Sequence, residues 1–462
     1  MPENPPSLTD FPSRISPMVV KELRQGLRTN MFTVAFILLQ AFMVLCLLIG
    51  AANPGSSGAE GFFWFFITVS LLFIQPLRGF NALSSEFQLN TMDLIQLTRL
   101  NTWGITMGKW TALNAQSLLL FTGVLPYLVL RYFLGGVDFV KDLGTLGLMV
   151  LGSGLASAVT IGCSAFKSYL IRITLLIGAF VGFQILMVTG RVYFAFSGFG
   201  SWGWPSILLW VLSGIYGIFF FLSLGASRIA SASENHSARK RLSAVLFAAV
   251  ALCFALWGSP DAALIFSGVV LGLACVDALT ENPPVFGAVL KPFSGNSITR
   301  LFAWIFTPGW HTGIAYFLLC SCLWGIAFYQ LKVPGMEPAE AVIWVLGLAG
   351  TISFPLIWIH LFFRKALSTQ MNFGFYLFAQ ACLALATILV SILTSAASSI
   401  ADAVLACVPI PSVILVALSD HNSGVVQPYF LVALILALLL SVGIPAIRGR
   451  EIYRQMRRSF QK

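Results

Sequence analysis

Residues 31–50 read MFTVAFILLQAFMVLCLLIG, and none of these twenty residues is charged. An α-helix needs about 20 apolar residues to cross roughly 30 Å of hydrocarbon, so this stretch has the length of a membrane span. Residues 428–447, PYFLVALILALLLSVGIPAI, have the same character near the other end of the chain. Neither stretch alternates apolar and polar residues as a barrel strand does, and unpaired backbone groups are costly in lipid. The sequence therefore predicts an all-α polytopic membrane protein.

The composition extends this prediction to the whole chain. Only 10% of the 462 residues are charged and 58% are hydrophobic, whereas a soluble domain carries about 25% charged residues. So few charges cannot form a water-facing surface, which excludes a soluble globular domain. The first apolar run follows a polar segment and precedes many similar runs, so we interpret it as a signal anchor and not as a cleaved signal peptide.

The apolar runs predict twelve transmembrane helices in two blocks of six. The first block occupies 31–226, the second occupies 243–447, and a cytoplasmic linker at 227–242 joins them. The spans are expected near Met31–Gly50, Phe62–Phe80, Trp110–Leu130, Leu143–Cys163, Leu170–Val188, Pro205–Leu224, Ser243–Trp257, Ala262–Leu279, Thr312–Gln330, Ala341–His360, Phe373–Ala397 and Pro428–Ile447. The stretch 404–418 contains two prolines and is short for a crossing, so we interpret it as re-entrant or interfacial. Duplication of the two blocks is a hypothesis from the span count alone.

The distribution of Lys and Arg predicts the orientation. With the N-terminus inside, four of the 27 basic residues fall outside: Arg131, Lys141, Arg191 and Lys332. Short cytoplasmic loops are rich in Lys and Arg, so both ends, 1–30 and the basic tail 448–462, are expected to be cytoplasmic. This topology explains the net charge of +10, and we expect no nucleic-acid partner. The predicted location is an inner or plasma membrane with multiple passes.

The segment just before the first span predicts an amphipathic helix over 15–30. Its apolar residues recur every four positions and form one stripe: Ile15, Val19, Leu23 and Leu27. Its basic residues lie on the opposite side: Lys21, Arg24 and Arg28. Such a helix can lie along the cytoplasmic leaflet with its cations toward anionic headgroups, although Glu22 interrupts the apolar arc. A cap helix packed on the bundle is the alternative.

The loop between the second and third spans has its own helix signals. Residues 83–108 read LSSEFQLNTMDLIQLTRLNTWGITMG. Asn90 with Asp93 three residues later is a capping-box variant. The leucines that follow share a face: Leu94 and Leu97. Asn101 or Thr102 offers a second helix cap. From this cap the third helix is expected to start in the cytoplasm and to carry Lys109 to the membrane edge. A plain connector is the alternative.

These two segments and their order resemble the membrane subunits of ABC-2 type transporters. That family opens with an amphipathic elbow helix that has a Lys-Glu-Leu core, which Lys21, Glu22 and Leu23 match. After its second span the family shows a Glu, a Thr that begins a leucine-rich helix ending in Leu-Thr, and a Gly-Lys at span three. This chain has the corresponding residues in that order: Glu86, Thr91, Leu94, Leu97, Thr98, Gly108 and Lys109. Asn90 stands where the family often has Gly, and Arg99 stands where it often has Pro.

The resemblance, which covers the first half of the chain, implies a permease subunit that is expected to be an exporter. In that family the loop after span two is a coupling helix that contacts a separate ATPase. The implied coupling residues are Glu86, Thr91, Asp93, Leu94, Leu97, Thr98 and Lys109. The implied elbow residues are Lys21, Glu22, Leu23, Arg24 and Arg28. Because the chain has no GxxxxGK[ST] sequence, ATP is expected to act through a P-loop ATPase subunit, and no cofactor is expected to bind directly. Membrane lipid and a second permease copy, as in a homodimer, are the other partners expected.

Catalytic and metal sites are not predicted. The eight cysteines include no CxxC pair, and no histidine has a nucleophile or carboxylate at motif spacing. The middles of the predicted spans lack Asp, Glu, Lys and Arg, which disfavours an ion-driven carrier. Four charged residues lie near span ends, where long cations can snorkel to the headgroups: Arg78, Arg131, Arg172 and Asp277.

Two other functions stay open at this stage. One is a membrane-embedded enzyme acting on lipid-linked substrates, for which Asp420 and His421 are the best candidates, and the other is a structural membrane component. The substrate and the direction of transport do not follow from the sequence, because every span is apolar.

Overall fold

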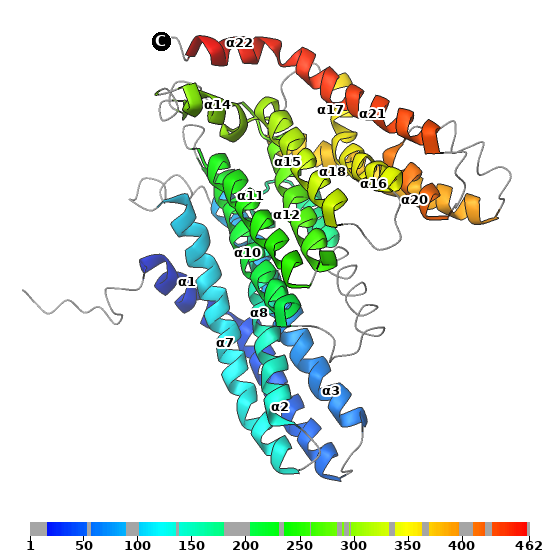
Figure 1. Cartoon of the computed structure of the whole chain (residues 1–462). Helices are drawn as coiled ribbons and strands as arrows, with labels where there is room; N and C mark the ends of the chain where they lie inside the picture. Colours follow the sequence, from blue (N-terminus) through cyan, green and yellow to red (C-terminus); the bar gives the residue numbers. More distant parts are fainter. Residues whose placement is uncertain are drawn as a thin grey trace, which may run out of the picture. The chain divides into compact units, whose positions relative to one another are not determined.

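The computed structural model describes residues 16–52, 57–88, 101–134, 138–179, 204–230, 235–258, 260–283, 289–290, 295, 297–331, 338–362, 369–396, 410–420 and 427–459. Every regular element in these ranges is helical (Figure 1). Eleven helices of the described residues are long and apolar enough to cross a membrane. The prediction of a polytopic α-helical membrane protein is confirmed. The remaining predicted span, Leu170–Val188, is described only in its first part, as the apolar helix Tyr169–Ala179.

The helices fall into two compact units. Unit 1 comprises Met1–Phe183 with Leu212–Ala230, and unit 2 comprises Gln184–Val211 with Ser231–Lys462. Unit 1 contains α1 (Pro17–Leu27), α2 (Asn30–Ala52), α3 (Ser57–Thr68), η1 (Val69–Ile74), α4 (Gln75–Leu77), η2 (Arg78–Asn81), α5 (Ser84–Gln88), α7 (Thr102–Leu134) and α8 (Phe139–Ser164). Unit 2 contains α11 (Ser237–Cys253), η3 (Phe254–Trp257), α12 (Pro260–Thr280), α14 (Ser297–Phe306), α15 (Trp310–Leu331), α16 (Pro338–Ser353), α17 (Pro355–Phe362), α18 (Thr369–Ala396), α20 (Pro411–Asp420), α21 (Gln427–Arg448) and α22 (Arg450–Ser459). Helix α10 (Trp204–Ile229) has residues in both units.

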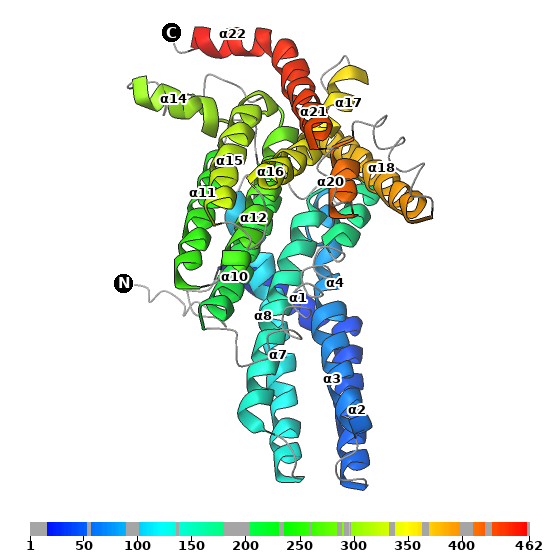
Figure 2. The same cartoon turned by 45° about the vertical axis from the view of Figure 1, so that its right-hand side comes forward.

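Helices α2, α3, α7 and α8 run side by side in unit 1 (Figures 1 and 2). Their inward faces form one apolar core: Leu39, Met43, Phe63, Ile67, Leu120, Val124 and Leu146. The Phe42 and Phe66 rings stack with their centroids 4.0 Å apart. The outward faces of the same helices are also apolar, as at Ile37, Leu48 and Leu148. Helices that are apolar on both faces suit a lipid environment.

The second span is an irregular helix. It passes from α3 through the π-helical segment η1 into α4, which has Pro76 in its first turn, and then into the 3-10 segment η2. Proline lacks a backbone N–H and disturbs the regular hydrogen-bond ladder, and π-helical segments interrupt α-helices in a similar way. The short helix α5 follows and brings Glu86 beside Lys109 of α7.

Helix α20 lies among α16, α18 and α21 in unit 2. Their shared core contains Ile343, Val413, Ile414, Phe430 and Leu434. Ten residues of α-helix rise about 15 Å, which is half of a 30 Å hydrocarbon layer. The segment 404–418, which was expected to be re-entrant or interfacial, is described only from residue 410, and there it is part of this packed helix.

The expected linker at 227–242 is helical at both ends. Helix α10 continues to Ile229, and α11 begins at Ser237. Lys240 and Arg241 are each 2% exposed, and Glu281, which directly follows α12, accepts bonds from both. This part of the basic run is therefore buried in unit 2, and the cytoplasmic linker between two six-helix blocks stays a prediction.

Charged residues near span ends have polar partners inside the protein. Arg172 is 4% exposed and donates to Asn81 Oδ1 at 3.0 Å and to Ser84 Oγ at 2.8 Å. Asp277 pairs with Lys240. Each of these residues thus has a polar partner within its own unit, and snorkelling of the cations near span ends stays a prediction.

Candidate functional site: an ion cluster at the start of span three

Helix α1 packs along the first turns of α7 through three residues spaced four apart, which share one helical face. The first, Met18, is 5% exposed and lies on Gly108, where an added Cβ would be 2.9 Å from Met18 Cγ. The third, Gly26, lies on Gln116, and a Cβ added to Gly26 would overlap the Gln116 amide. A glycine on each helix therefore allows the two helices to approach closely.

The middle residue of this face, Glu22, belongs to an ion cluster. Lys109 Nζ donates to Glu22 Oε1 at 2.7 Å and to Glu86 Oε1 at 3.0 Å. The Nζ atom of Lys21 lies 3.6 Å from the same Glu86 oxygen. The Lys109 side chain is 4% exposed and the Glu86 side chain 9% exposed. We call Lys21, Glu22, Glu86 and Lys109 the Lys109 cluster; its two cations and two carboxylates balance in charge.

A second polar set, around Arg78 at the end of the second span, reinforces the same junction. Arg78 Nη2 donates to the Gly26 carbonyl oxygen at 2.8 Å and to Thr29 Oγ1 at 3.0 Å. Gln75 Nε2 donates to Gln116 Oε1 at 3.2 Å, and Arg78 also donates to that oxygen. The end of α1, the second span and α7 are thus joined by hydrogen bonds as well as by ion pairs.

The structure brings together part of each predicted residue set. From the elbow set, Lys21 and Glu22 join the cluster, Leu23 is half-buried, and Arg24 and Arg28 are exposed. From the coupling set, Glu86 and Lys109 join the cluster. The other coupling residues lie outside the described residues: Thr91, Asp93, Leu94, Leu97 and Thr98.

The apolar stripe of α1 lies next to the face that contacts α7, and its Val19 is also near Gly108. Val19 and Leu23 are half-buried, and Leu27 is 37% exposed. The packing of α1 on α7 agrees with the cap-helix alternative. The in-plane location of α1 stays a prediction. Sequence reasoning missed Met18 and Gly26 as contact residues. The one sequence signal of the face that contacts α7 was the charged Glu22 inside the apolar arc.

An apolar pocket lies beside α7, within unit 1. Its volume is about 490 Å³, and residues of α7, α8 and α10 line it, among them Trp103, Trp110 and Phe219. The one amide in its wall is Asn114, whose Oδ1 is buried without a hydrogen-bond partner among the described residues. The pocket suits an apolar group that carries one hydrogen-bond donor.

Comparisons with known proteins identify no relative of this chain. No family model matches it, no curated protein matches it, and no solved structure matches it.

Proposed function

We propose that this protein is the permease subunit of an ATP-driven ABC-2 type transporter, that it exports its substrate, and that a separate P-loop ATPase subunit hydrolyses the ATP. The Lys109 cluster is the observation that carries the proposal. The family resemblance singles out the elbow helix, the Glu after span two and the Gly-Lys at span three. These three segments supply Glu22, Glu86 and Lys109, which are in direct contact.

The cluster gives such a permease a means of coupling. Residues 89–100 connect α5 to α7, and the cluster holds the chain close to both ends of that loop through Glu86 and Lys109. A force that an ATPase applies to the loop would therefore reach α7, which has 33 residues and is about 50 Å long. Through Glu22 the same force would reach α1. Rigid helices joined by ion pairs are the elements through which rocking of a bundle is transmitted.

The competing explanation is that the cluster is a structural contact with no partner protein. Buried ion pairs in membrane proteins serve packing as well as function. The two explanations differ in one respect, because only the first requires the adjacent loop to bind another polypeptide.

A pull-down from gently solubilised native membranes tests the proposal. The tagged native protein is compared with a variant in which 89–98 is replaced by a Gly/Ser linker while Glu86 and Lys109 stay in place. We expect mass spectrometry to find a P-loop ATPase with the native protein and to lose it with the linker variant. Replacement of 332–337, a predicted loop on the opposite side, is the matched control and should retain the ATPase.

Two results would count against the proposal. If no P-loop ATPase accompanies the intact native protein, the transporter function loses its support. If the ATPase binds the native and linker proteins equally, the coupling surface lies elsewhere and the role assigned to the Lys109 cluster is wrong.

A further inference from the structure

Helices α14 and α22 pack against each other at one end of unit 2 (Figure 2). The Trp304 and Tyr453 rings stack with centroids 5.5 Å apart, and Met456 is fully buried in a cluster that contains Ala303. The Tyr453 hydroxyl donates to the His311 carbonyl oxygen at 2.8 Å. Burial raises the pKa of the Tyr453 phenol, so this hydroxyl stays a donor at neutral pH. We call α14 and α22 together the α14–α22 layer.

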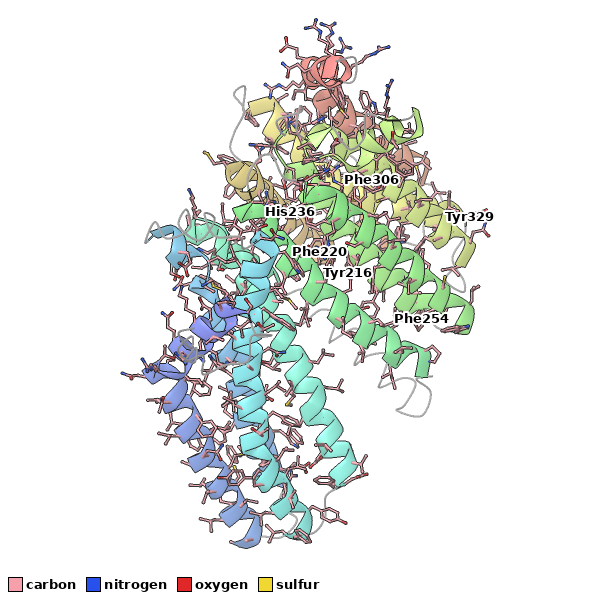
Figure 3. The ribbon with its side chains drawn as sticks, turned by 90° about the vertical axis from the view of Figure 1, so that its left-hand side faces the viewer. Tyr216, Phe220, His236, Phe254, Phe306 and Tyr329 are labelled. Atoms are coloured by element: carbon pink, nitrogen blue, oxygen red, sulfur yellow. The ribbon has the colours of Figure 1, made fainter. Side chains whose placement is uncertain are left out.

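The face of α22 that points away from this contact is strongly basic. It contains four exposed arginines at helical spacing: Arg450, Arg454, Arg457 and Arg458. Nitrogen-tipped side chains project from α22 in Figure 3. The only acidic residue of the helix is Glu451, and in the part of the chain that the structure describes no ion pair involves any of the four arginines. The basic face thus has no acidic partner among those residues.

Helix α14 adds an exposed apolar edge to the layer. Leu301 is 66% exposed and Phe302 is 48% exposed, and the Phe302 ring stacks on Phe306, which Figure 3 labels. Along the chain α14 lies between a candidate span that ends at Thr280 and one that begins at Trp310. Because α14 connects the ends of two candidate spans, we expect its apolar edge to lie where the hydrocarbon meets the headgroups.

We propose that the α14–α22 layer binds anionic phospholipids of the cytoplasmic leaflet. Helix α22 directly follows the candidate span that ends at Arg448, so its arginines are within reach of the headgroups. Guanidinium groups form paired hydrogen bonds with phosphate oxygens, and basic residues next to a span attract anionic lipid. The apolar edge of α14 enters the acyl boundary beside them, as in other interfacial helices. This inference does not depend on an ATPase partner.

Lipid titration of the full-length purified protein tests the inference. Phosphatidylglycerol or phosphatidylcholine is added to detergent micelles, and the melting temperature is followed to obtain an apparent affinity. We expect the native protein to be stabilised by phosphatidylglycerol much more than by phosphatidylcholine, and the difference to shrink at high salt. Replacing all four arginines of the basic face by Gln should weaken phosphatidylglycerol binding by about two to three orders of magnitude, because each contributes about fivefold and the four factors multiply.

The control variants separate lipid binding from folding. Replacing the same four arginines by Lys keeps the charge and should retain most of the affinity, and the melting temperature without lipid should be close to native in both variants because the side chains are exposed. Leu301→Ser with Phe302→Ser should weaken binding of both lipids by removing the apolar edge.

Two results would overturn the inference. One is unchanged phosphatidylglycerol affinity in the four-Gln variant. The other is binding of a polyglutamate peptide that depends on the same arginines while phosphatidylglycerol has no effect. The second result would show that the basic face serves an acidic protein and not a membrane.

Discussion

Lys109 lies in the first turns of a span, and two carboxylates hold its ammonium group there. Removing an ammonium ion from water costs several kcal/mol, and close carboxylates offset that cost only when the geometry is good. Taking away one member of such a set leaves a buried charge without its partner. The stability of the junction between α1 and α7 therefore depends on Lys109 more than on any exposed lysine nearby.

Lys109→Met should destabilise the protein by about 3–5 kcal/mol, because Glu22 and Glu86 lose their shared partner. The measurement is thermal unfolding of the detergent-purified protein. Lys21→Met removes a cation that is 54% exposed, so it should cost at most about 1 kcal/mol. Adding Glu22→Gln and Glu86→Gln to Lys109→Met should recover part of the loss. Equal melting temperatures for Lys109→Met and Lys21→Met would contradict this account of the cluster.

The contact between Gly108 and Met18 gives a second prediction at the residue scale. Gly108→Leu should cost about 1–3 kcal/mol, because the new side chain overlaps Met18 and separates α1 from α7. Gly104, one turn earlier on the same helix, has open space around it, so Gly104→Leu is the matched control and should be neutral. Thermal unfolding measures both variants, and Met18→Ala should partly rescue Gly108→Leu. Identical losses at positions 104 and 108 would refute the close contact.

At the scale of elements, each unit has buried charges at one end of its helices. In unit 2, Arg241 of α11 holds the chain just before α15. Its Nη1 donates to the carbonyl oxygens of Ile305 at 2.7 Å and Thr307 at 2.8 Å, and its Nη2 donates to Glu281 Oε2 at 2.9 Å. A single side chain of α11 thus bonds to the residue that follows α12, to the last turn of α14 and to the turn before α15. Such bonds from a charged donor are each stronger than neutral ones.

Arg241→Met should loosen that segment without unfolding unit 1. Loss of hydrogen bonds to a charged group, each about 1.5–3 kcal/mol, should make amides of 305–312 exchange about 10- to 100-fold faster. Hydrogen exchange with mass spectrometry measures this. Arg239→Met, an exposed position on the same helix, is the control and should leave those amides unchanged. Faster exchange spread evenly over both units would show that Arg241 does not act locally.

The elements were predictable to different degrees for a physical reason. The length of an apolar run is a local property, so spans such as Asn30–Ala52 could be located from the sequence. The burial of Lys240 and Arg241 could not be predicted from the sequence. Their acidic partners lie about one helix further along the chain, and only packing brings them together. Likewise, Glu22 and Lys109 are 87 residues apart. The misfit of Glu22 in the apolar arc marks a polar face, but it does not identify Lys109 as the partner.

For the molecule as a whole, the central prediction from the sequence is its orientation in the membrane. The positive-inside pattern predicts that both termini are cytoplasmic. The described residues supply eleven candidate spans, and the predicted span Leu170–Val188 extends beyond them. An even number of crossings is what two cytoplasmic termini require.

Thiol labelling in intact cells tests this orientation. In a background with the eight native cysteines replaced, a membrane-impermeant reagent should label Asp138→Cys, which is predicted to lie outside. It should not label Arg454→Cys until the cells are broken open, because the basic tail is expected to be cytoplasmic. Labelling of Arg454→Cys in intact cells would reverse the predicted topology of the C-terminal end.

The most direct test of the proposed function is site-specific photocrosslinking in living cells. A photoreactive amino acid replaces Gln96 in the loop between α5 and α7, and the same amino acid replaces Val137 in the loop after α7 as the control. We predict that position 96 crosslinks to a polypeptide with a P-loop sequence and that position 137 does not. If position 96 yields no such crosslink in folded, membrane-inserted protein, this loop does not contact an ATPase, and the permease function proposed from the Lys109 cluster is contradicted.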